Sequence, residues 1–287
     1  MQTATTELSA TASADAREWF RAVREGLESL TLAPYLGPAA STTGGSPASY
    51  DQLAEFFGKK VALPKRARGN PWASAQYVEG QKLRASVTRI MAEAFSTPVA
   101  PSPLQRYLAT LASPLIVDTW YDGAMRSALS TRSDWAEIQG ISRAGIGESR
   151  WYRGYAADGA EIPLDSVRSQ PTLLYKPHGG VVPAQNFLIS DADYVEVLTE
   201  IDIQTPIPEL VRERREKLGF VYLGCRFHDQ LLRNYARQIA KRSSGPRFAV
   251  VDPRQGMTRN EERLFAELEV RVLVSPWADA FQRIVEG

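Results

Sequence analysis

The sequence contains almost no cysteine and almost no histidine. Cys225 is the only cysteine among 287 residues, and His178 and His228 are the only histidines. A single cysteine cannot form an intramolecular disulfide or a cysteine-based zinc site. The sequence therefore predicts a protein without a bound metal, and it favours a reducing cytoplasm as the compartment.

The chain also lacks an excess of charge and a long apolar run. It has 34 Lys and Arg residues against 33 Asp and Glu residues, for a net charge of +1. This balance makes nucleic acid an unlikely partner, even for the basic loop at residues 59–68, and no run approaches the ~20 apolar residues that span a bilayer. Residues 1–14 are rich in Thr, Ala and Ser without the pattern of a signal peptide, and we interpret them as a flexible tail.

Short apolar runs alternate with helix-length segments along the rest of the chain. The runs are residues 30–36, 115–117, 173–176, 220–223, 248–251 and 270–274. This alternation indicates right-handed βαβ units with buried parallel strands. The sequence predicts one α/β domain over residues 15–287, with a Rossmann-like doubly wound parallel sheet, a helical insertion at about residues 50–100 and a β-hairpin at residues 151–162.

Small and polar residues follow several of these runs. They include a glycine loop at residues 37–41, the segment at residues 118–122, His178 beside two glycines, and Gly224. Open α/β sheets bind ligands where the carboxyl ends of their strands meet, and an imidazole there exchanges a proton near neutral pH. A histidine that is satisfied by a loop carbonyl is the alternative interpretation, and the local sequence leaves both open.

Taken together, these strand ends resemble the sirtuin-like (silent information regulator-like) NAD-binding family. The motifs are Gly-x-x-x-Ser from Gly37, Thr-x-Tyr-Asp from Thr119, Lys-x-His-Gly from Lys176 and Phe-x-x-Leu-Gly from Phe220. The resemblance spans about residues 30–275 and is closest to the bacterial branch that lacks zinc. It implies a Rossmann-like fold that holds NAD across the strand ends, and an NAD-consuming role in anti-phage defence.

The resemblance also implies a set of site residues. The catalytic residues would be His178, as the base that draws a proton from a ribose hydroxyl, and Asp122, beneath the nicotinamide ribose. The NAD-binding residues would be Gly37, Ser41, Thr119, Trp120, Tyr121, Gly224, Cys225 and Asp252. Gly37 and Ser41 would contact the pyrophosphate, while Asp252 is assigned to the adenosine ribose from its place after a strand.

Two positions depart from the family pattern. Ala39 stands where the family usually has glycine, and Trp120 stands where the family has the asparagine that positions the reacting end of NAD. An indole offers one donor, no acceptor and greater bulk. Two hypotheses follow: an NAD glycohydrolase that releases nicotinamide, activated by a protein partner or by homo-oligomerisation, and a non-catalytic sensor or scaffold that binds NAD or ADP-ribose. A deacylase is disfavoured because zinc-bearing sirtuins use four cysteines.

Overall fold

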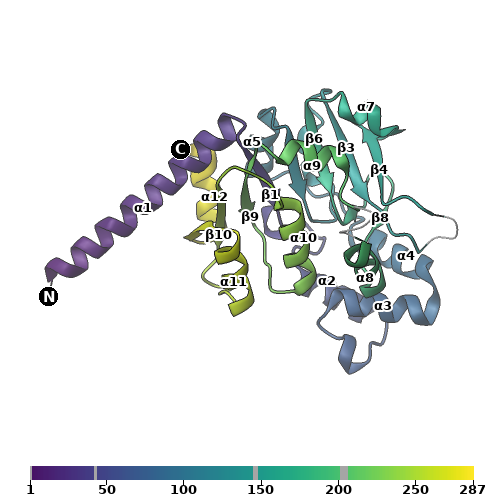
Figure 1. Ribbon diagram of the computed structural model, residues 1–287. Helices are drawn as coiled ribbons and strands as arrows, with labels where there is room; N and C mark the ends of the chain where they lie inside the picture. The colour runs from purple at the N-terminus through teal and green to yellow at the C-terminus, as the bar shows by residue number, and fades with distance from the viewer. Residues whose placement is uncertain (1, 42–43, 145–147, 201–205) are drawn as a thin grey trace.

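The structure, a computed structural model, describes residues 2–41, 44–144, 148–200 and 206–287, with side-chain surroundings from residue 15 onward. Its centre is a nine-stranded sheet in the order β11-β10-β9-β1-β2-β6-β3-β4-β5 (Figure 1). The strands are β1 Leu32–Leu36, β2 Leu115–Asp118, β3 Trp135–Gly140, β4 Tyr152–Ala156, β5 Glu161–Ile162, β6 Thr172–Lys176, β9 Gly219–Leu223, β10 Arg247–Val251 and β11 Val270–Val274. All neighbours from β11 through β3 are parallel. The predicted Rossmann-like α/β fold is confirmed.

The edge of the sheet ends in an antiparallel hairpin, as the sequence predicts. Strand β4 pairs with β3 and with β5 in antiparallel register. Gly159 in the connecting turn has φ +96°, a conformation that glycine adopts without strain. A second, two-stranded sheet, β7 Gly179–Gly180 with β8 Asn186–Phe187, follows β6.

Helices cover both faces of the sheet and enclose two hydrophobic cores. Alternation along β1 sends Leu32 and Leu36 into one core, and Ala33 and Tyr35 into the other. The first core is completed by α1 Gln2–Glu28, α5 Pro103–Thr110, α6 Ala124–Leu129 and α12 Trp277–Glu286. The second is completed by α2 Tyr50–Lys60, α3 Pro71–Lys82, α4 Arg84–Ala94, α7 Leu164–Arg168, α8 Asp191–Glu200, α9 Glu209–Arg215, α10 Gln230–Ala240 and α11 Arg259–Glu267.

Helices α2, α3 and α4 form the helical insertion, within the range that the sequence predicts. Ser49 caps α2 by accepting a hydrogen bond from the Gln52 N–H, and Asn70 caps α3 by accepting one from the Ala73 N–H. These helices gather on one side of the molecule, next to α8 (Figure 1). The caps determine where the insertion's first two helices begin, and both starts lie near the site described below.

The first helix begins earlier than the sequence predicts. Helix α1 starts at Gln2, whereas the sequence predicts a flexible tail up to residue 14 and a helix from residue 15. Residues 2–14 contain neither proline nor glycine, the two residues that disfavour a helix interior most strongly. From residue 15 onward, where side-chain surroundings are described, α1 is anchored to the sheet by Trp19, Phe20, Val23 and Leu27.

Candidate functional site

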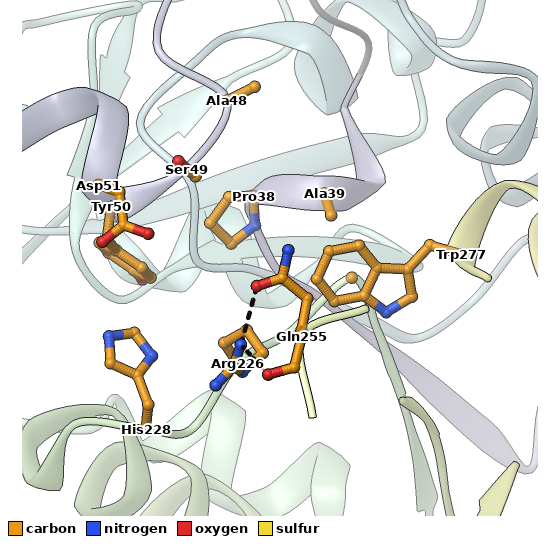
Figure 2. Close-up of a pocket in the computed structure, with 11 residues that line it drawn as sticks. Pro38, Ala39, Ala48, Ser49, Tyr50, Asp51, Arg226, His228, Gln255 and Trp277 are labelled. Carbon is orange, nitrogen blue, oxygen red and sulfur yellow. Dashed lines mark hydrogen bonds between the residues drawn. The ribbon is translucent and has the colours of Figure 1, made fainter. Parts of the chain in front are cut away.

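A crevice lies at the carboxyl ends of β1 and β9, where the direction of strand order changes. The chain continues from β1 towards β2 on one side, and it returns later to place β9 on the other side. Ligands of open α/β sheets bind at such a switch point. The crevice is lined by Pro38, Ala39, Ala48, Ser49, Tyr50, Asp51, Gly224, Arg226, His228, Gln255 and Trp277 (Figure 2).

Two glycines allow the loops after β1 and β9 to pack directly on each other. A Cβ atom on Gly37 would lie 2.3 Å from the Gly224 carbonyl oxygen. Gly224 has φ +70°, and a Cβ atom there would lie 2.4 Å from the backbone nitrogen of Ala40. The N–H groups of Gly37 and Ala39 donate to the carbonyls of Leu223 and Gly224. These glycines therefore hold two loops together, and the two N–H groups are already engaged.

One end of the crevice combines an aromatic ring with an oriented cation. Figure 2 shows the Trp277 indole on one side and Arg226 beside Gln255 on the floor. Arg226 donates from Nη1 to Gln255 Oε1 at 2.9 Å and from Nε to the buried Glu261 at 3.2 Å. A guanidinium held in this way presents its remaining donors in a fixed direction, which suits a phosphate.

Asp252 supports this end from behind the crevice wall. Its carboxylate accepts hydrogen bonds from Arg254 and, at 3.3 Å, from the backbone N–H of Trp277. The hydrogen bonds from Arg254 lower the pKa of Asp252 to about 2, so the carboxylate is ionised at neutral pH. Asp252 therefore positions Trp277 and is absent from the lining of the crevice, where the sequence predicts it.

His228 lies in the crevice, at the end opposite Trp277. Its ring centroid is 6.2 Å from that of Tyr50, and Asp51 lines the same end. Partial burial and the neighbouring Arg226 charge lower the pKa of His228, which keeps the ring neutral at pH 7. The sequence does contain a signal for His228 as a site residue, because His228 also follows a strand end, the Phe-x-x-Leu-Gly motif. The resemblance assigns the catalytic role to His178 instead.

His178 is buried in a separate aromatic cluster. The residue is 1% exposed, its Nδ1 atom lies 3.0 Å from the Tyr194 hydroxyl, and its ring packs 4.7 Å from that of Tyr235. Burial, followed by the Lys176 charge, lowers the pKa of His178 to about 3. Among the described residues Nε2 has no hydrogen-bond partner, and an unpaired buried polar atom costs about 1–3 kcal/mol.

A buried ion pair holds the segment after β2 against the end of β6. Lys176 Nζ donates to Asp118 at 2.7 Å and to the carbonyl oxygens of Trp120 and Asp122 at 2.5 and 3.0 Å. Burial raises the pKa of Asp118 to about 6 although Lys176 opposes the shift, so the carboxylate stays ionised at neutral pH. The Asp122 carboxylate accepts from the Ala124 N–H at the start of α6, so Asp122 is buried and engaged.

Trp120 is a core residue in this structure. Its Nε1 donates to the Pro47 carbonyl at 3.0 Å, and its ring centroid lies 5.1 Å from that of Tyr50 and 5.5 Å from that of Phe95. Both neighbours flank the helical insertion, so the indole joins the sheet edge to it. The bulk that sets Trp120 apart from the family's asparagine is used for packing.

The other residues assigned from the sequence also lie around the crevice instead of within it. The Thr119 hydroxyl donates to the Leu36 carbonyl, and the Tyr121 hydroxyl donates to the Leu188 carbonyl. Ser41 Oγ accepts from Gln105, and Cys225 Sγ contacts the Tyr35 carbonyl at 3.4 Å. Burial raises the pKa of the Cys225 thiol, which keeps the thiol protonated. Of the ten assigned residues, Gly224 alone lines the crevice.

The fold is a Rossmann-like α/β fold, and the crevice lies at the switch point, where open sheets of this kind bind ligands. Residues 114–273 match the family described as the SIR2-like domain. The match covers more than half of the chain, and the protein belongs to this family. It includes His178 and Gly224, whereas the loop after β1 and the helical insertion lie outside it. No curated protein matches the chain.

The described residues contain neither a metal-binding cluster nor a membrane-spanning helix. Within the ranges described above, no group of three or more His, Cys, Asp or Glu side chains is arranged to hold a metal ion. Over the same ranges, no helix is both long enough and apolar enough to cross a membrane.

Proposed function

We propose that this protein binds NAD or ADP-ribose, with the adenosine half of the ligand in the crevice between Trp277 and Ser49. The observation that carries the proposal is the pairing of the Trp277 ring with the oriented Arg226 guanidinium at the switch point of a SIR2-like domain. An aromatic face suits a purine base, and a guanidinium suits a diphosphate. Membership of the family supports NAD as the ligand.

The reacting half of NAD does not fit the site in this form. The crevice has a volume of about 170 Å³, below the ~300–1,000 Å³ of typical small-molecule sites. The residues assigned to the nicotinamide ribose, Tyr121, Asp122 and His178, are all 3% exposed or less. The geometry therefore favours binding of NAD over cleavage of its nicotinamide–ribose bond.

Calorimetry with AMP, ADP-ribose and NAD tests this function. We expect all three to bind, and we expect Trp277→Ala to weaken binding by about 10-fold or more, since stacking on an aromatic side chain is worth ~1–3 kcal/mol per base. Trp151→Ala is the matched control, because Trp151 is a half-buried tryptophan on the distant hairpin. Absence of heat at millimolar ligand, with a folded protein, would contradict the proposal.

A second candidate function is NAD glycohydrolysis, and one observation favours it. His178 carries a buried ring nitrogen that has no partner among the described residues, and it lies at the strand end where the resemblance places the base. Cleavage of the nicotinamide–ribose bond builds positive charge on the ribose, and a base near the ribose hydroxyls assists it. Release of nicotinamide that is lost in His178→Ala would support this function. Activation by a partner or by self-association, and a role in anti-phage defence, remain predictions from the resemblance.

A further inference from the structure

A continuous row of aromatic rings separates the crevice from His178. Tyr50 lines the crevice, and its ring centroid lies 5.0 Å from that of Trp72. Trp72 lies 6.4 Å from Tyr194, whose hydroxyl contacts His178. We call Tyr50, Trp72 and Tyr194 the aromatic wall. Its members are 6% exposed or less, so the wall excludes solvent from the imidazole.

Two members of the wall lie at the beginnings of helices. Tyr50 is the first residue of α2, and Trp72 is the second residue of α3. The far end of the insertion is anchored differently, because Arg84 at the start of α4 pairs with the buried Asp193 at 2.7 Å and also contacts the Phe187 carbonyl. Displacement of Tyr50 and Trp72 therefore requires a shift of the first turns of α2 and α3. The contacts of Arg84 with Asp193 and Phe187 do not need to break.

The unpaired nitrogen of His178 gives a reason for such a movement. Tyr194 engages Nδ1, while Nε2 has no partner among the described residues. Buried polar atoms in native proteins nearly always have partners, so an unpaired one requires an explanation, and a ligand hydroxyl is one group that could pair with Nε2. Among the described residues, Tyr50, Trp72 and Tyr194 form the row of contacting rings that connects the crevice lining with His178.

We propose that Tyr50 and Trp72 are gate residues that set the length of the ligand site. With both rings in place the site ends at Tyr50 and holds the adenosine half of the ligand. With both rings displaced the crevice continues to His178 and holds a complete dinucleotide. The proposal rests on the proposed function for the identity of the ligand, but the movement itself can be measured without nucleotide.

Chemical labelling of His178 provides that measurement. The chain has two histidines, and the ring of His228 contacts those of Tyr50 and Trp72, so the unmodified chain, produced without a histidine tag, serves as the background. Diethylpyrocarbonate is the probe, and peptide mapping by mass spectrometry gives the rate at His178. We expect slow labelling in this background and an acceleration of about 10-fold or more when Tyr50→Ala is added, because local opening controls access to a buried group.

Phe56→Ala is the matched control for this experiment. Phe56 lies on the same helix as Tyr50 and is partly buried, but it does not line the crevice. Equal acceleration by Phe56→Ala would show general loosening of the insertion and would overturn the gate. Rapid labelling of His178 with Tyr50 intact would overturn it as well. If Tyr50→Ala does not fold, Tyr50→Leu and Trp72→Leu replace it, and unchanged labelling in both refutes the proposal.

Nucleotide is added last, so that the gate and the proposed function are tested separately. We expect NAD, but not AMP, to change the labelling rate of His178, because only the dinucleotide extends past Tyr50. Acceleration by Tyr50→Ala without any effect of NAD would leave the gate in place and count against the proposed ligand. An equal effect of AMP and NAD would contradict the gate's role in setting the length of the site.

Discussion

At the scale of single residues, the two histidines differ in what packs over them. His228, just before α10, is exposed and lines the crevice, whereas His178, which the resemblance assigns to the ligand site, is 1% exposed. A strand end in the sequence places a residue at the edge of the sheet, but it does not show which side chains from other elements cover that residue. Here the rings of Tyr194 and Tyr235 cover His178.

The burial of His178 predicts a dependence of stability on pH. Its pKa is about 3 in the folded protein and about 6.5 in the unfolded chain, so the unfolded chain binds more protons as the pH falls. The free energy of unfolding is therefore unaffected above about pH 6.5 and decreases between pH 6.5 and 3. At pH 5 this residue alone should cost about 2 kcal/mol relative to pH 7.5.

Urea unfolding at pH 7.5 and pH 5 checks this expectation. His178→Gln should reduce the loss of stability between the two pH values by about 2 kcal/mol. His228→Gln is the control and should change the loss less, because that ring keeps contact with solvent. An identical pH dependence in the unmodified protein and in His178→Gln would show that the imidazole is not buried neutral.

At the scale of elements, the ion pair between Lys176 and Asp118 joins β6 to the segment after β2. Both side chains are 3% exposed or less, and the ammonium also satisfies two carbonyl oxygens of that segment. Burial removes both charges from water, and this desolvation offsets much of their attraction. The pair matters for stability mainly because loss of one partner leaves the other charge buried and uncompensated.

Lys176→Met should therefore destabilise the protein strongly, by about 3–5 kcal/mol, because it leaves the Asp118 charge buried without a partner. Adding Asp118→Leu should restore a large part of this loss, since the double variant buries no charge. Guanidinium denaturation of the single and double variants measures the coupling. A Lys176→Met protein as stable as the unmodified chain would mean that the pair is solvated.

At the scale of the whole molecule, the first part of α1 is expected to be dispensable. Within the part of α1 whose side chains are described, Trp19, Phe20, Val23 and Leu27 pack it on the sheet, and we expect these four residues to hold the helix in place. Deletion of residues 1–14 should therefore leave the thermal unfolding midpoint unchanged and nucleotide binding intact. Scanning calorimetry of the shortened chain is the measurement, and Leu27→Ala, which opens a cavity costing ~2–5 kcal/mol, is the control. A marked drop on truncation would indicate that residues 1–14 contribute contacts.

The sequence by itself determined the fold class and most of the elements. Apolar runs bounded by glycine and proline marked the strands, because a buried parallel strand must be apolar on both faces. Ser102 followed by Pro103 marked the start of α5, and the structure has a capping box there. Asp158 and Gly159 likewise indicate a hairpin turn. Helix starts and tight turns can be predicted in this way because each depends on only a few adjacent residues.

Only the tertiary structure decided which residues face the crevice. Tyr50 and Trp72 come from the helical insertion, and Trp72 packs against both Tyr50 and Tyr194, the residue that contacts His178. Trp120 looked like an altered ligand contact, yet it packs between Tyr50 and Phe95. The sheet order brings strand ends to one edge, but side-chain packing across elements sets access to each of them. That packing depends on contacts between distant segments, which no local pattern of residues encodes.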